Sequence, residues 1–123
     1  MVMDARLKLK AQIMCGDEIA MGPGKAALLD AIAETGSISA AGRRLGMSYR
    51  RTWLLVDAMN RCWAEPLVAT ATGGSKGGGA RVTALGEQVR ADYAALVGRL
   101  TDSADEASLM AAVRAAPVPP ARH

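Results

Sequence analysis

The amino-acid sequence predicts a mainly α-helical protein with a small β component. Apolar residues recur every three or four positions over residues 26–63 and again over 84–100, which is the period of helices with one buried face. Residues 6–13 alternate instead between polar and apolar, and short apolar runs flank the glycine-rich stretch 73–79, as in strands. We therefore expect helices preceded by one strand and interrupted by one hairpin.

The first elements are a strand and a helix. Four apolar side chains share one face of the strand predicted over residues 6–13: Leu7, Leu9, Ala11 and Ile13. Gly22-Pro23-Gly24 predicts the start of a helix, because proline suits a first turn whose N–H groups have no helical partner. Gly36 ends that helix. Its buried stripe is predicted to contain Leu28, Leu29, Ile32 and Ala33.

Two more helices follow, joined by a tight turn. Ser37 or Ser39 can cap the first of them, and Gly46 occupies the position of a left-handed residue that closes it. Its apolar stripe is Ile38, Ala41 and Leu45. Ser48 is a good N-cap for the longer second helix. The spacing predicts that Trp53, Val56, Met59 and Trp63 pack in the core, in preference to nucleobase stacking by the tryptophans.

The charge pattern of this helix-turn-helix indicates a surface for double-stranded DNA. Residues 35–56 contain four arginines and no carboxylate, although the whole chain has 15 basic and 12 acidic residues. A solubilising surface normally mixes both signs, whereas a phosphate-facing surface excludes carboxylates. The N-terminal turns of the second helix would enter the major groove. The residues predicted to contact DNA are Ser37, Ser39, Arg43, Arg44, Ser48, Tyr49, Arg50, Arg51 and Thr52.

A second acid-free stretch, residues 66–86, predicts a wing. Residues 67–70 and 81–83 are the two short strands, and the glycine loop between them can lie close to a DNA backbone. The loop residues predicted to contact DNA are Thr72, Gly73, Gly74, Ser75, Lys76, Gly77, Gly78 and Gly79. A phosphate-binding loop is the weaker alternative, because Gly77 follows Lys76 and a strand comes next. Gly22 to Ala27 fits G-x-G-x-x-A but lacks the rest of a βαβ unit.

The last long helix predicts dimerisation. Its apolar stripe is nearly heptad and consists of Leu85, Val89, Tyr93, Leu96 and Leu100. We favour pairing with a second chain over folding back on the same domain, since two-fold symmetry gives such DNA-binding domains affinity and register. Ser103-Ala104-Asp105-Glu106 matches a capping box and predicts a short helix to about Ala115. The expected domain is 1–103, followed by a short helix and disordered proline-rich tail over 104–123.

Composition argues against catalysis. His123 is the single histidine, and Cys15 and Cys62 have no CxxC spacing, so we expect no catalytic residue, no metal site and no cofactor. No apolar run reaches the length of about 20 residues that a membrane span requires. A signal peptide is not evident either. The sequence therefore predicts a cytoplasmic protein that is not an enzyme and has no membrane partner.

Several of these motifs together resemble a known family. The start Ser48-Tyr49-Arg50 of the second helix and the wing Thr72-Gly73-Gly74-Ser75-Lys76-Gly77-Gly78-Gly79 are the most specific. The stretch from about residue 5 to residue 100 resembles the N-terminal domain of the molybdate-responsive ModE family, which is related to the LysR-type winged helix-turn-helix. The resemblance implies a homodimeric transcription factor, with residues 48–63 in the major groove and the first strand and last long helix in the dimer contact.

Full-length members of that family carry C-terminal oxyanion-binding domains, and nothing after Leu100 is long enough to be one. The chain is thus expected to act constitutively, to sense an effector such as molybdate through a separate protein, or to regulate something unrelated to molybdenum. We expect a sequence-specific regulator of transcription that binds DNA as a homodimer. The alternatives are a winged helix that pairs with another regulator without touching DNA and, last, an oxyanion or nucleotide sensor.

Overall fold

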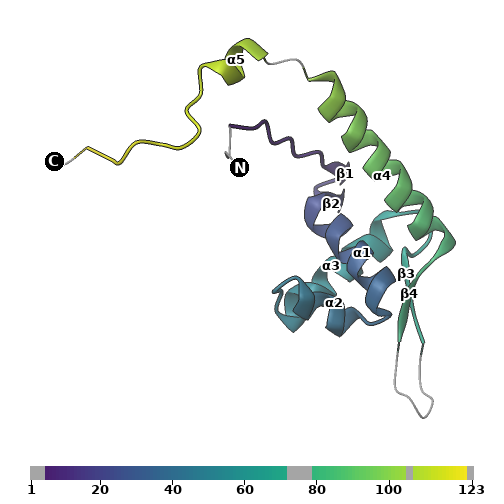
Figure 1. Cartoon of the computed structure of the whole chain (residues 1–123). Coiled ribbons are helices and arrows are strands. Elements are labelled where there is room, and N and C mark those ends of the chain that lie inside the picture. Colours follow the sequence, from purple (N-terminus) through teal and green to yellow (C-terminus); the bar gives the residue numbers. More distant parts are fainter. Residues whose placement is uncertain (1–4, 72–78, 105–106, 122–123) are drawn as a thin grey trace.

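The computed structural model describes residues 5–71, 79–104 and 107–121. Figure 1 shows three shorter helices grouped together, with one long helix, residues 84–103, along one side. The elements are β1 (Ile13–Cys15), β2 (Glu18–Met21), α1 (Pro23–Thr35), α2 (Ile38–Arg44), α3 (Tyr49–Cys62), β3 (Val68–Thr70), β4 (Ala80–Val82), α4 (Ala84–Ser103) and α5 (Ala107–Ala111). The strands form two separate antiparallel pairs, β1 with β2 and β3 with β4. The predicted class, mainly helical with a small β component, is confirmed.

The N-terminal strand differs from the prediction. Residues 5–12 form neither helix nor strand, and β1 begins only at Ile13, where it pairs with β2. Leu7 and Leu9 are each 42% exposed, so the expected half-buried face does not form over this stretch. The physical reason is that an alternating pattern becomes a strand only beside a neighbour that completes its backbone hydrogen bonds. Among the described residues, no strand pairs with 5–12.

The predicted caps of the first three helices are confirmed. Gly36 has a φ of 69° and donates its N–H to Ile32 O at 2.8 Å, which ends α1. Ser37, and not Ser39, caps α2 by accepting the N–H of Ala40 at 3.1 Å. Ser48 caps α3 in the same way. Gly46 has a φ of 70°, so its conformation explains why glycine stands at the turn.

The core lies where α1, α2, α3 and α4 meet the strands. Leu28, Leu29, Ile32, Met59 and Leu67 are all 0% exposed. On α1 one expected member is wrong, because Ala33 is exposed and Ala31 takes its place on the buried face. At the end of α2 the expected Leu45 is wrong as well, since it is 36% exposed. The helices α2 and α3 approach closely, since a Cβ on Gly42 would lie 2.2 Å from Thr52 Oγ1.

The wing strands are anchored to the helices from two sides. The Asn60 side chain of α3 accepts the N–H groups of Leu67 and Val68 and donates to Val68 O, at 3.0 to 3.1 Å. The N–H of Ala80, in β4, donates to Gly36 O at 2.9 Å. The base of the wing is therefore held against both α3 and the turn between α1 and α2.

Helix α4 spans the predicted residues and extends to Ser103, but half of its apolar stripe folds back on its own domain. Val89 and Tyr93 are buried, and the Tyr93 hydroxyl donates to Ala11 O at 2.8 Å. Leu85 and Leu96 are half-buried, whereas Leu100 is 41% exposed. The fold-back alternative thus applies to the first part of the stripe.

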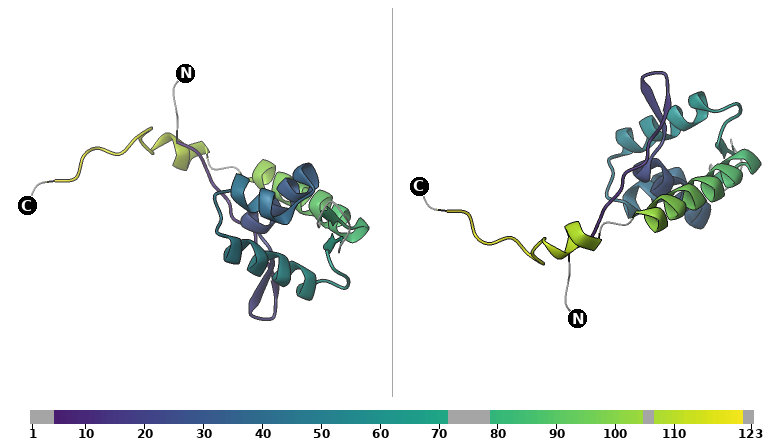
Figure 2. Two further views of the ribbon diagram at one scale, coloured as in Figure 1. Left: turned by 90° about the horizontal axis from the view of Figure 1, so that it is seen from below. Right: turned by 90° about the horizontal axis from the view of Figure 1, so that it is seen from above.

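The C-terminal end also departs from the prediction. Ser103 is the last residue of α4 and does not cap the next helix, α5, which is shorter than expected. Asp105 and Glu106 lie outside the described residues. Residues 112–121 form neither helix nor strand, and Figure 2 shows this end extending away from the helices. Among the described helices, none is both long and apolar enough for a membrane span.

Candidate nucleic-acid interface

The N-terminal half of α3 presents an open surface. Tyr49 is 70% exposed, Leu54 is 55% exposed, and Arg50 and Arg51 are exposed as well. Neither of the two arginines makes an ion pair with a described residue. This surface, which we call the α3 front, carries two free guanidinium groups suited to base edges and phosphates.

Thr52 does not belong to the α3 front, although the sequence predicts it there. It is 1% exposed, and its hydroxyl donates to Ser48 O at 2.8 Å. Its methyl and hydroxyl face Gly42 of α2. We assign Thr52 to the packing of α2 on α3, because a buried hydroxyl with a backbone partner cannot reach DNA.

A recess lies between Trp53 of α3 and the base of the wing. This cavity of about 130 Å³ is lined by Ser37, Ile38, Ser39, Trp53, Thr70, Gly79 and Ala80. It brings three predicted DNA-contacting residues, Ser37, Ser39 and Gly79, together at one place. The Ser37 hydroxyl accepts a capping bond but keeps its own proton to donate. Parts of the chain that are distant in sequence therefore share one side of the molecule.

Trp53 is a surface residue that the sequence interpretation assigns to the core. It is 37% exposed and lines the recess, and its ring centroid lies 6.2 Å from that of Tyr49. Val56 and Met59 are buried as predicted, and of the two tryptophans Trp63 packs against the core, since it is half-buried and its indole N–H donates to Ala20 O at 3.0 Å. The spacing of Tyr49 and Trp53, four residues apart on a helix, is the signal that could have identified the aromatic pair.

The two arginines of α2 differ in their surroundings. Arg44 pairs with Glu34 of α1, with both side chains at least half exposed. Arg43 is exposed and pairs with no described residue. An acid-free stretch of sequence is thus not wholly an acid-free surface, because α1 brings a carboxylate to α2.

Arg43→Ala is expected to lower the salt dependence of DNA binding by about one unit of the logarithmic slope, as the loss of one phosphate contact would. Arg44→Ala should lower this slope by less, because the Arg44 side chain must break its ion pair with Glu34 before it can contact a phosphate. Fluorescence anisotropy on a random duplex across a salt series measures both slopes. Equal effects would show that the Glu34 pair does not persist on DNA.

The wing loop is only partly described. Thr72, Gly73, Gly74, Ser75, Lys76, Gly77 and Gly78, all predicted to contact DNA, lie outside the described residues. Gly79 is described, and its carbonyl accepts the N–H of Ala71 at 2.8 Å, which closes the hairpin above β3 and β4. The register is Val68 with Val82, Ala69 with Arg81, and Thr70 with Ala80. The predicted strands are confirmed to within one residue.

A helix-turn-helix of α2 and α3, packed on α1 and followed by a two-stranded wing, defines a winged helix-turn-helix protein. Residues 25–87 match the model of the bacterial regulatory helix-turn-helix proteins of the lysR family, and the chain belongs to that family. The resemblance stated from the sequence is confirmed by curated relatives as well.

Three relatives illustrate the similarity. The chain is 51% identical over 76 residues to the molybdenum-pterin-binding protein MopB of Rhodobacter capsulatus, covering 62% of this chain and 28% of the relative. It is 42% identical over 69 residues to the molybdenum transport protein ModE of Azotobacter vinelandii, covering 56% and 26%. It is 40% identical over 67 residues to the DNA-binding transcriptional dual regulator ModE of Escherichia coli (strain K12), covering 54% and 26%. The matched part thus spans less than a third of each relative.

Proposed function

We propose that the chain binds double-stranded DNA in a sequence-specific manner and regulates transcription as a homodimer. The observation that carries this proposal is that Ser37 and Ser39, Trp53 of α3 and Gly79 of the wing base meet in one recess, while the first turn of the same α3 carries the exposed, unpaired Arg50. In this arrangement α3 would lie in the major groove and the wing on the adjacent backbone. Arg50 and Arg51 would divide base reading and backbone positioning between them.

Fluorescence anisotropy with a random duplex at low salt tests DNA binding directly. Binding that weakens steeply with added salt supports the proposal, because phosphate contacts release counterions. Selection of preferred duplexes from a random pool then gives the operator and the spacing of its half-sites, and with it the symmetry of the complex. No salt-sensitive binding at all would contradict the proposal.

The apolar part of the α3 front favours one alternative. Leu54 is 55% exposed between the arginine-bearing turns and the middle of α3, where a protein partner could cover it. In that case the chain would pair with another regulator and would not contact DNA. The anisotropy experiment separates the two functions.

A connection to molybdenum rests on the relatives. Their printed names include molybdenum-pterin binding and molybdenum transport. We propose that this chain regulates genes of molybdate or related oxyanion metabolism, with a separate effector-sensing protein as a possible partner. Chromatin immunoprecipitation under molybdate-replete and molybdate-depleted growth would locate the regulated promoters.

Dimerisation would use the part of the chain that is not covered by its own domain. Leu9 and Leu100 are 42% and 41% exposed, and both line one shallow pocket between the N-terminal segment and the end of α4. Exposed leucines from two segments form an apolar surface of the kind that symmetric dimers bury. Val89 and Tyr93, in contrast, already pack in the core.

Leu100→Glu is expected to weaken the dimer by about tenfold or more, because a carboxylate would have to be desolvated in the contact. Leu109→Glu, on α5, is the matched control at another leucine that is 61% exposed. Sedimentation equilibrium measures both dissociation constants. A dimer that tolerates Leu100→Glu as well as the control would place the contact elsewhere.

A further inference from the structure

The N-terminus of α1 has donors without acceptors. Its N-cap is Gly22, which offers no side-chain cap, and its first turn carries no acidic residue. The first backbone bond runs from Ala26 N–H to Gly22 O at 2.9 Å, so the N–H groups of Gly24 and Lys25 have no described acceptor. In a helix of 13 residues these free N–H groups and the positive end of the dipole attract an anion.

Lys25 points to a ligand independently of the helix end. It is only 8% exposed, yet it makes neither a hydrogen bond nor an ion pair with any described residue. No fully buried side-chain nitrogen in the described residues lacks a partner, so the Lys25 ammonium must reach solvent at its tip. Burial, more than any other influence, lowers the pKa of Lys25 below its ordinary value. Lys25 therefore has a buried stem and an accessible ammonium that no described carboxylate contacts, so the ammonium is available to an external anion.

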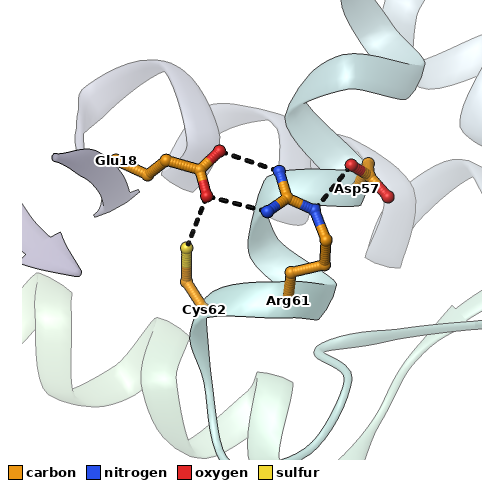
Figure 3. Close-up of polar contacts among 4 residues, drawn as sticks. All are labelled: Glu18, Asp57, Arg61 and Cys62. Carbon is orange, nitrogen blue, oxygen red and sulfur yellow. Dashed lines mark hydrogen bonds and ion pairs between the residues drawn. The ribbon is translucent and has the colours of Figure 1, made fainter. Parts of the chain in front are cut away.

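The carboxylate of Glu18 does not supply that counterion. It accepts two hydrogen bonds from the Arg61 guanidinium, each 2.8 Å long, and Figure 3 shows the two groups facing each other. The thiol of Cys62 donates to the same carboxylate at 3.9 Å. Arg61 also holds Asp57 at 2.8 Å. Arg61 thus holds both carboxylates by hydrogen bonds, whereas Glu18 acts on Lys25 only through space, and Lys25 forms no ion pair with any described residue.

A groove opens in front of Lys25 and the helix end. Its volume is about 420 Å³, and its lining includes four cations, Lys8, Lys10, Lys25 and Arg51, and no carboxylate. Gly22 and Gly24 line it as well, and a Cβ on Gly24 would meet nothing within 4 Å. Both residues whose N–H groups lack a described acceptor, Gly24 and Lys25, therefore line this groove.

We propose that this groove binds a phosphate-type oxyanion, held by the N–H groups of Gly24 and Lys25, the Lys25 ammonium and the Arg51 guanidinium. The group has two possible sources. One is a backbone phosphate of DNA lying beside α3, which rests on the proposed function, since Arg51 belongs to the α3 front. The other is a free tetrahedral oxyanion, which does not depend on DNA binding.

Three variants test the site, with two matched controls. Lys25→Met removes the charge and keeps an unbranched side chain, and Arg99→Met removes an exposed, unpaired charge on α4 as its control. Gly24→Glu places a carboxylate in the first turn, where it would compete with the ligand, and Gly24→Ala controls for the added Cβ. Arg51→Gln removes the second cation. Gly24→Glu and Gly24→Ala leave Lys25 unchanged, so the test does not depend on one variant folding.

The first arm measures Tm in sulfate or phosphate against chloride at equal ionic strength, without DNA. Both oxyanions stabilise proteins in general by exclusion from their surface, so only the difference between variants is informative. If the source is a free oxyanion, the wild type, Arg99→Met and Gly24→Ala gain several degrees more than Lys25→Met, Arg51→Gln and Gly24→Glu.

The second arm measures the salt dependence of binding to a random duplex. If the source is a DNA phosphate, Lys25→Met lowers the logarithmic slope by about one unit, and Arg99→Met leaves it unchanged. A wild type that binds no DNA would contradict the proposed function alone, and the first arm would then decide. The proposed site is wrong if the Lys25→Met and Gly24→Glu variants match their controls in every arm that applies.

Discussion

Arg50→Ala is expected to weaken binding to the preferred DNA site by roughly 1–3 kcal/mol, or about 5- to 150-fold, and to flatten the sequence preference at one base pair. Arg50 lies in the first turn of α3, is exposed, and pairs with no described carboxylate, so no internal contact competes with a base. Its guanidinium can donate two parallel hydrogen bonds to guanine, an arrangement that alanine cannot replace.

Anisotropy titrations on the selected site and on random DNA, at one fixed salt concentration, measure this effect. Arg99→Ala serves as the control, because it removes the same charge from an exposed position on another helix, α4. Direct base reading requires a larger loss on the selected site than on random DNA. An equal loss on both would make Arg50 a phosphate anchor only.

Gly86→Ala is expected to destabilise the domain by about 1–3 kcal/mol or more, although the same change in most helices is favourable. A Cβ on Gly86 would lie 2.3 Å from the backbone oxygen of Leu67 and 2.5 Å from Val82 Cγ1. Neither contact can be relieved by turning the end of a flexible side chain, because one is backbone and the other is a β-branched residue of β4. The start of α4 would have to move away from the wing strands.

Gly98→Ala provides the matched control on the same helix. A Cβ at Gly98 would meet nothing within 4 Å, so the gain in helix propensity, up to about 1 kcal/mol, remains. Urea unfolding followed by circular dichroism gives both free energies of unfolding. Two variants that are equally stabilised would show that α4 does not approach Leu67 so closely. The DNA affinity of the folded Gly86→Ala variant would further show whether DNA binding depends on the position of the wing strands relative to α4.

Much of the fold could be predicted because its signals are local. The caps at Ser37 and Ser48, and the left-handed glycines at Gly36 and Gly46, each depend on a hydrogen bond or a dihedral angle within a few residues. The prediction of a strand over 6–13 was wrong, because pairing requires a second segment that the alternating pattern does not identify, and only Ile13–Cys15 found one in β2. For the same reason, the spacing on α4 did not distinguish a dimer contact from packing on its own domain.

By itself, the amino-acid sequence determined the order and type of the helices, the tight turn between α2 and α3, the wing strands and the family. Only the tertiary structure decided which side chains are available for binding. In the folded chain Thr52 is buried against Gly42, and Trp53 is exposed beside the wing base. Arg44 forms an ion pair with Glu34. The tertiary structure also placed Glu18 in hydrogen bonds with Arg61, and Lys25 forms no ion pair within the described part of the chain. The reason is that helix formation depends on neighbours three or four positions away, whereas burial and charge pairing depend on which distant elements meet.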